Sequence, residues 1–118
     1  MPMMAVAMPL LPGKTAAWRK WLEELNGPRR QEFVESRQRV GVRERTFLQP
    51  SPMGDLVIVT LEGDDPGSAF GQMMSANDAF STWFADRARE FHGDLPVPMT
   101  EAPSELVIDT ASISAPVR

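Results

Sequence analysis

The single histidine of the chain, His92, is the first residue to consider for chemistry. The chain contains no cysteine, so disulfides, thiolate zinc sites and cysteine nucleophiles are excluded. Any acid–base role that needs an imidazole therefore falls on His92. It stands between Phe91 and Gly93, at the predicted C-terminal end of a helix, where the helix dipole favours a cation. A catalytic role and a plain surface position at a helix end both agree with this placement.

The polar run Arg43-Glu44-Arg45-Thr46 is the second candidate. Successive side chains of a strand point to opposite faces, so Glu44 and Thr46 share one face while Arg43 and Arg45 share the other. The pair that faces the helices would line a pocket, where an arginine holds a carboxylate or enolate oxygen through paired donors. Alternatively, the strand is an edge strand whose charges stay solvated or pair across a dimer. The candidate catalytic residues are His92, Arg43 and Glu44.

Large apolar side chains supply the candidate ligand pocket. Trp18 and Trp21 lie three residues apart on a predicted helix, so at least one belongs to the core and the other can cover the mouth of a cavity. The pair Met73-Met74 can fill a core or line an apolar pocket, because methionine is an adaptable side chain. The residues predicted to line a pocket are Trp18, Arg45, Thr46, Met73 and Trp83.

The recognised motifs for metal ions and phosphates are missing from the sequence. There is no paired-histidine spacing, no phosphate-binding glycine loop, no Ser/His/Asp order and no calcium-binding loop of the EF-hand type. The acidic pair Asp64-Asp65 precedes Pro66, which is typical of a helix cap with proline at the first helical position. We therefore expect neither a metal ion nor a cofactor.

Hydrophobic periodicity and breaker residues divide the chain into strands and helices. The apolar stripe Trp18, Trp21, Leu22 and Leu25 predicts a helix from Lys14, which must kink or stop at Asn26-Gly27-Pro28. A second helical stretch follows up to Gly41, a residue well suited to end a helix. A further helix starts at Pro66, meets a fresh cap at Asn77-Asp78, and stops at Gly93. The predicted strands are residues 3–10, 42–49, 56–61 and 106–109.

This order predicts an α+β fold of the ferredoxin-like βαββαβ type. Its four-stranded antiparallel sheet has the order 4-1-3-2, with the helices on one face. The first and third strands are the most apolar and suit the centre, whereas the second is charged and the fourth is short, as edge strands often are. The predicted domain covers residues 1–109, and residues 110–118 form a flexible tail.

The strand Leu56 to Leu61 lacks the alternation expected of a sheet with one solvated face. The first strand is also apolar on both faces. Exposed apolar patches of this kind are usually interfaces, so we expect a homodimer through the open sheet face. Alternatively, a C-terminal segment folds back over this face.

Length and charge narrow the class of protein. A chain of 118 residues fits one domain. Its net charge of −4 argues against a general nucleic-acid surface. The apolar N-terminal run has no basic start and is broken by Pro9 and Pro12, so it predicts neither a signal peptide nor a membrane span. We expect a cytoplasmic protein.

Three short motifs carry a resemblance to a known group of proteins. They are Pro12-Gly13-Lys14, the Gly-Val-Arg-Glu segment at residues 41–44, and Phe80-x-x-Trp83-Phe84. With the apolar pattern of residues 3–109, they make the chain resemble the dimeric α/β-barrel superfamily, and within it a bacterial family related to antibiotic-biosynthesis-type monooxygenases. The resemblance implies a homodimer with a cavity between helices and sheet but assigns no activity by itself.

Two functions agree with this resemblance. The first is the binding of a small apolar ligand, and the alternative is a cofactor-free monooxygenase or isomerase that acts on an aromatic or polyketide-like molecule. Trp83 and His92 are similar in placement to residues of the haem-degrading members. Those members also use an asparagine on the first strand, where this chain has only methionine, alanine and valine.

Overall fold

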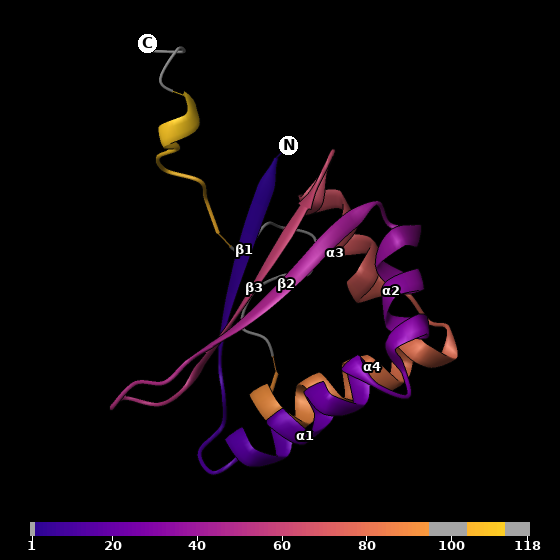
Figure 1. The fold of residues 1–118 in the computed structure, drawn as a ribbon, viewed down its shortest axis with the longest axis vertical. Coiled ribbons are helices and arrows are strands. Elements are labelled where there is room, and N and C mark those ends of the chain that lie inside the picture. Colours follow the sequence, from indigo (N-terminus) through magenta and orange to yellow (C-terminus); the bar gives the residue numbers. More distant parts are fainter. Residues whose placement is uncertain (1, 95–103, 113–118) are drawn as a thin grey trace.

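In the part of the chain that the structure describes, the fold is an antiparallel sheet of three strands with four α-helices on one side of it (Figure 1). The computed structural model describes residues 2–94 and 104–112. The elements are β1 (Met3–Pro9), α1 (Thr15–Asn26), α2 (Arg30–Arg39), β2 (Val42–Gln49), β3 (Leu56–Gly63), α3 (Pro66–Ser75), α4 (Ala79–His92) and the 3₁₀ turn η1 (Thr110–Ser112). The α+β class predicted from the sequence is confirmed.

Helix boundaries follow the breaker and cap residues of the sequence. α1 ends and α2 begins around Gly27-Pro28, as predicted. Gly41, which follows α2, has φ +74°, the left-handed conformation that favours glycine. The Asp65 side chain accepts a hydrogen bond from the Ser68 amide at 3.0 Å, and Asp78 accepts one from the Ser81 amide at 3.2 Å. These two caps start α3 and α4, and the predicted cap at Asp78 separates the two helices.

The strand order is β1-β3-β2, and both pairings are antiparallel. β3 is the central strand, as its apolar sequence predicted. Val59 is paired with Val6 on one side and with Thr46 on the other. This register places the even-numbered residues of β1 and β2 on the same face as the odd-numbered residues of β3.

The predicted fourth strand is wrong for the part of the chain described here. Residues 106–109 belong to no strand, so the sheet has three strands and β1 lies at an edge. The four-stranded order 4-1-3-2 is therefore not confirmed. A short apolar segment becomes a strand only when its amide and carbonyl groups pair with a neighbour, and residues 106–109 have no such pairing in the structure.

The core lies between the sheet and the helices, in two clusters. One cluster gathers around α1 and α4, and its buried members are Leu10, Trp18, Trp21, Leu25, Val57, Phe80 and Phe91. The other lies beneath α3, and its buried members are Met4, Val6, Val42, Leu61, Ala69 and Phe70. The predicted helical stripe of α1 is thus confirmed, because three of its four residues are buried and Leu22 packs against them.

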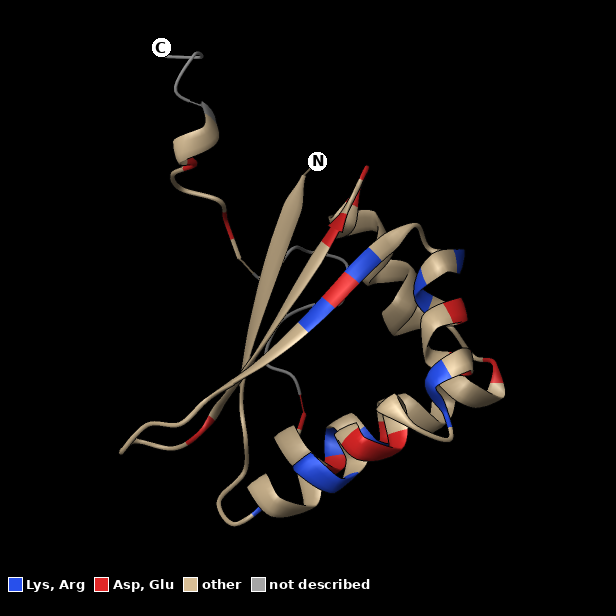
Figure 2. Cartoon of the chain, in the orientation of Figure 1, with Lys and Arg blue, Asp and Glu red and all other residues tan. Residues whose placement is uncertain are grey.

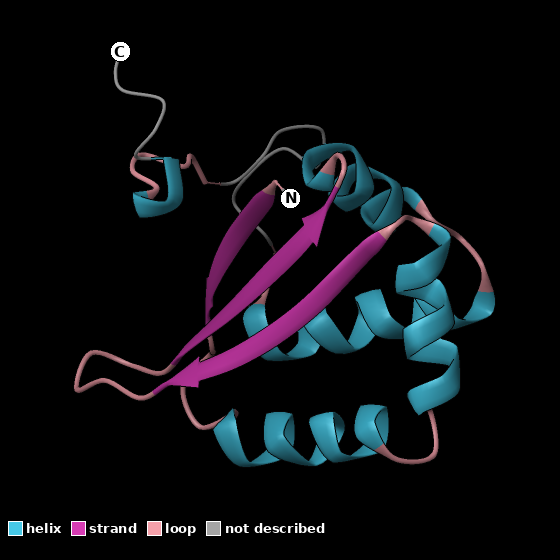
Figure 3. Cartoon of the chain, turned by 45° about the horizontal axis from the view of Figure 1, so that its top comes forward, coloured by secondary structure: helices cyan, strands magenta, loops and turns pink. Residues whose placement is uncertain are grey.

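Among the residues that the structure describes, none of the four α-helices covers the opposite face of the sheet (Figure 3). Met3 and Phe47, at its two edges, are about half exposed. Between them, the side chains of Ile58 and Thr60 on β3 are only partly exposed. Arg45 lies on this open face and contacts Glu62 at 3.6 Å. In residues 2–94 and 104–112, no helix has the length and apolar character needed to cross a membrane.

Candidate functional site

The structure decides which side of β2 meets the helices. Glu44 and Thr46 face the helices, whereas Arg43 and Arg45 are exposed on the open face. Figure 2 shows basic and acidic residues in alternation along this strand, which carries Arg43, Glu44 and Arg45. The pair that shares the interior is therefore the carboxylate and the hydroxyl, and the arginines of β2 do not line a pocket between helices and sheet.

A buried ion pair joins α2 to β2. The Arg37 Nε donates to Glu44 Oε1, and the two side chains are only 10% and 7% exposed. Arg37 Nη1 also donates to Ser36 Oγ at 3.1 Å, and Thr46 donates to the second carboxylate oxygen of Glu44 at 3.3 Å. Both oxygens of Glu44 are thus occupied, as a buried carboxylate requires.

The Arg37 guanidinium lies beside two stacked aromatic rings, whose centres are 5.9 Å apart. Its Cζ is 4.9 Å from the ring centre of Phe33 and 4.7 Å from that of Phe84. Such contacts favour a cation that has lost most of its water. The sequence did not single out Arg37 as a buried residue. The available signal was its spacing, because Phe33, Arg37 and Val40 fall at i, i+4 and i+7.

A small cavity lies beside this ion pair. Its volume is about 40 Å³, and its walls are Trp18, Trp21, Leu22, Leu25, Phe33, Glu44, Thr46, Val57, Val59, Phe84, Ala88 and His92. The indole N–H of Trp21 is buried and has no hydrogen-bond partner among the residues described. The cavity has room for a water molecule but not for an organic substrate.

The cavity brings together four of the residues singled out from the sequence. Trp18 and Thr46 from the predicted pocket meet Glu44 and His92 from the predicted catalytic set. Trp83 lies outside it, with the Arg29 guanidinium 3.9 Å above its ring. Met73 is also elsewhere, packed against the cluster beneath α3.

His92 is held by a backbone carbonyl. Its Nδ1 lies 2.8 Å from the oxygen of Pro9, which can only accept, so Nδ1 carries the proton and donates. In the neutral imidazole, Nε2 then holds the free lone pair. Burial lowers the pKa of His92 below its usual 6.5, and the bond to Pro9 opposes this shift. His92 is thus a fixed, neutral imidazole near pH 7.

A larger groove opens between β1, α3 and α4. Its volume is about 260 Å³, and it is lined by Met8, Phe70, Met74, Phe84, Ala85, Ala88, Arg89, Gly93 and Asp94. Most of this lining is apolar, and Arg89 and Asp94 supply its charged groups, with Arg89 Nε 3.8 Å from Asp94 Oδ1. Phe84 and Ala88 line both this groove and the small cavity. α4 therefore lies between the two spaces, and both have mostly apolar walls.

The groove was only partly foreseen from the sequence. Met74 was one of two adjacent methionines considered for a pocket, and the structure places Met74 in the groove. Met8, Phe70 and Phe84 come from three different elements, and no local pattern marks them as neighbours. No cluster of three or more metal-ligating side chains occurs in the described parts of the chain.

Comparison of the chain with models of protein families, with curated proteins and with solved structures finds no match.

Proposed function

We propose that this protein binds a small apolar molecule in the groove between β1, α3 and α4. The observation that carries the proposal is the groove itself, with about 260 Å³ of space enclosed by aromatic, methionine and alanine side chains. Ligand pockets are typically concave and mostly apolar, with few polar groups. Met8 and Met74 provide polarizable sulfur atoms that make favourable contacts with an aromatic ring, so an aromatic ligand suits the groove well.

The polar groups of the groove favour a neutral ligand. Arg89 and Asp94 carry opposite charges and lie close enough to compensate each other. A ligand with one polar group, such as a hydroxyl or carbonyl, gains a hydrogen-bond partner there. A strongly charged ligand would have to separate the two residues first.

We further propose that the protein acts as a homodimer through the open face of the sheet. Met3 and Phe47 expose large apolar area there, and Ile58 lies between their strands on the same face. Patches of this kind are usually covered by a partner, and a second copy is the simplest one. A dimer with two sheets face to face would have the arrangement of the dimeric α/β barrels, which the chain resembles in its sequence motifs.

A cofactor-free monooxygenase or isomerase is the second candidate function. Glu44 and His92 line the small cavity, so polar side chains do reach the space between helices and sheet, as an enzyme of this kind requires. Both oxygens of Glu44 are already bonded to Arg37 and Thr46, however. Because the cavity has room only for water, ligand binding is the better-supported function.

Titration calorimetry with 2-naphthol, an apolar aromatic probe, tests the binding proposal. We expect saturable binding to the wild-type chain and at least about a tenfold loss of affinity in Ala85→Phe, whose new ring fills the groove. Ala16→Phe, at an exposed position of α1, is the matched control and should bind like wild type. Equal binding by Ala85→Phe, with an unchanged circular dichroism spectrum, would contradict the proposal, and so would an absence of binding to the wild-type chain.

A further inference from the structure

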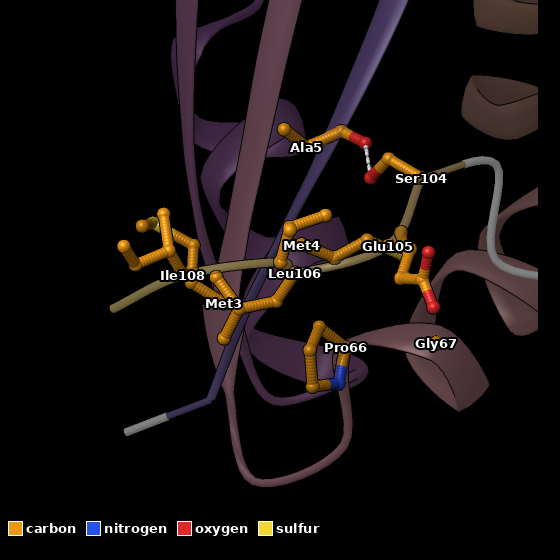
Figure 4. Close-up of a pocket in the computed structure, with 10 residues that line it drawn as sticks. Met3, Met4, Ala5, Pro66, Gly67, Ser104, Glu105, Leu106 and Ile108 are labelled. Atoms are coloured by element: carbon orange, nitrogen blue, oxygen red, sulfur yellow. Dashed lines mark hydrogen bonds between the residues drawn. The ribbon is translucent and has the colours of Figure 1, made fainter. Parts of the chain in front are cut away.

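The segment Ser104–Asp109, called here the C-terminal arm, begins beside β1 and then leaves it. The Ser104 hydroxyl donates to the carbonyl of Ala5 (Figure 4). Beyond this contact, the consecutive side chains of Leu106, Val107 and Ile108 are 70%, 83% and 81% exposed. A space of about 450 Å³ is bounded by the arm, β1 and the start of α3. Because these three adjacent apolar side chains stay in water, the protein does not gain the free energy that their burial would give.

No strand of the described residues pairs with the outer edge of β1. Pro2 accepts a hydrogen bond from the Gly63 amide, and Leu10 donates one to Asp55. Paired residues alternate along an antiparallel ladder, so the even-numbered residues of β1 bond to β3. Met3, Ala5 and Ala7 therefore direct their N–H and C=O groups outward. Ser104, on the carbonyl of Ala5, is the one partner that the described part of the chain provides for these groups.

The edge also lacks the usual protection against pairing. Edge strands commonly carry lysine, a bulge or an inward-facing charge that prevents pairing. β1 carries no charged residue at all, as Figure 2 shows, and its Pro9 removes a donor only at the end of the strand. By contrast, the opposite edge strand, β2, carries three charged residues.

We propose that the C-terminal arm of one copy pairs with the β1 edge of a second copy as its fourth strand. The described residues hold both halves of the contact. They contain an apolar segment, Leu106–Asp109, and a strand edge of similar length, Met3–Ala7, and neither pairs with another described strand. Each copy both offers and receives an arm, so the exchange closes around a two-fold axis without leaving free ends. The exchange also buries the exposed arm and gives each sheet four strands. This inference rests on the homodimer of the proposed function and names how its two copies are joined.

Cysteine cross-linking tests the exchange directly, since the chain has no native cysteine. Chains carrying Ala7→Cys and Val107→Cys are mixed, unfolded, refolded together and treated with a short bis-maleimide. We expect a product containing one chain of each kind, in at least about tenfold excess over the product from Ala16→Cys with Val107→Cys. The double variant Ala7→Cys/Val107→Cys tests the alternative, in which the arm pairs with β1 of its own chain. The proposal is overturned if this variant cross-links only within single chains and the mixed single variants give no cross-linked product.

The second readout is the particle mass in solution of the full-length variant Leu106→Asp/Ile108→Asp, measured over a range of protein concentrations. We expect its dimer to dissociate at a concentration at least about tenfold higher than wild type, whereas Met53→Asp, in an exposed turn, should behave like wild type. If the dimer is unchanged by the arm substitutions, the exchange is refuted and the dimer through the sheet face stands. If the wild-type chain is a monomer at all concentrations, both are refuted. Binding of 2-naphthol in the groove is an independent readout.

Discussion

At the scale of single residues, the most demanding feature is the ion pair between Arg37 and Glu44. Both side chains are almost fully removed from water. Each charge is therefore stable inside the protein only while the other is present. The neutral hydroxyls of Ser36 and Thr46 complete the hydrogen bonding, which makes the group a unit of four side chains rather than a surface contact.

Arg37→Met should destabilise the protein by about 3 kcal/mol, because it leaves the Glu44 carboxylate buried without a partner. The double variant Arg37→Met/Glu44→Met should recover most of this loss, since it removes both charges. Arg45→Met, which breaks the exposed contact with Glu62, is the control and should cost less than about 1 kcal/mol. Urea unfolding measures all three, and equal losses in Arg37→Met and Arg45→Met would contradict the interpretation.

His92 gives a pH-dependent prediction. Burial lowers its pKa below 6.5 in the folded state. At a pH between the folded and the unfolded pKa, the unfolded chain therefore binds more protons than the folded one. Stability should therefore be complete above the unfolded pKa and fall as the pH decreases through 6.5 toward the folded pKa. As His92 is the only histidine, its single Cε1–H proton resonance gives the folded midpoint. The stability of His92→Gln should depend less on pH over this interval, and a midpoint above 6.5 would contradict the prediction.

At the scale of elements, local chemistry explains where most helices start and stop. The caps at Asp65 and Asp78, the interruption at Gly27-Pro28 and the end at Gly41 were all predicted from the sequence and are confirmed. These signals act over one helical turn, so neighbouring residues are enough to recognise them. The predicted strand at residues 106–109 failed for the opposite reason, because a strand depends on a pairing partner that is distant in the sequence.

Gly41→Ala should cost about 1 kcal/mol through backbone strain alone. The position has φ +74°, and an added Cβ atom would meet no neighbouring atom within 4 Å, so steric overlap adds nothing. Gly67→Ala is the matched control. It lies in α3, has ordinary helical φ, and its Cβ would make only a van der Waals contact with Asp65 at 3.8 Å. This control should be neutral or slightly stabilising, and thermal unfolding that ranked the two variants in the reverse order would refute the argument.

At the scale of the whole molecule, the two faces of the sheet differ. The helices bury one face, and on the other Phe47 remains 53% exposed. Ile58, directly opposite Phe47 in the register, belongs to the same patch. In a single chain this apolar area stays in contact with water. A dimer would bury it and gain roughly 25 cal/mol of favourable free energy per Å².

Phe47→Asp should weaken self-association by at least about tenfold, because it places a charge within the proposed apolar contact. Sedimentation equilibrium at micromolar concentration measures the effect. Met53→Asp, outside the sheet, should leave the association unchanged. A wild-type mass near one chain, or equal association by Phe47→Asp, would refute the dimer through this face.

The sequence by itself determined the α+β class, the helix breaks, the caps, and the fact that Glu44 and Thr46 share a face. These properties depend on residues within a few positions of one another, where the period of a helix or strand is strict. Tertiary structure alone decided that this pair, and not the arginines of β2, faces the helices, since the alternation of a strand is the same in either orientation. It also decided that Arg37 is buried and that Met8, Phe70 and Phe84 enclose one groove. Each of these follows from packing between elements that are distant in the sequence, which no local pattern encodes.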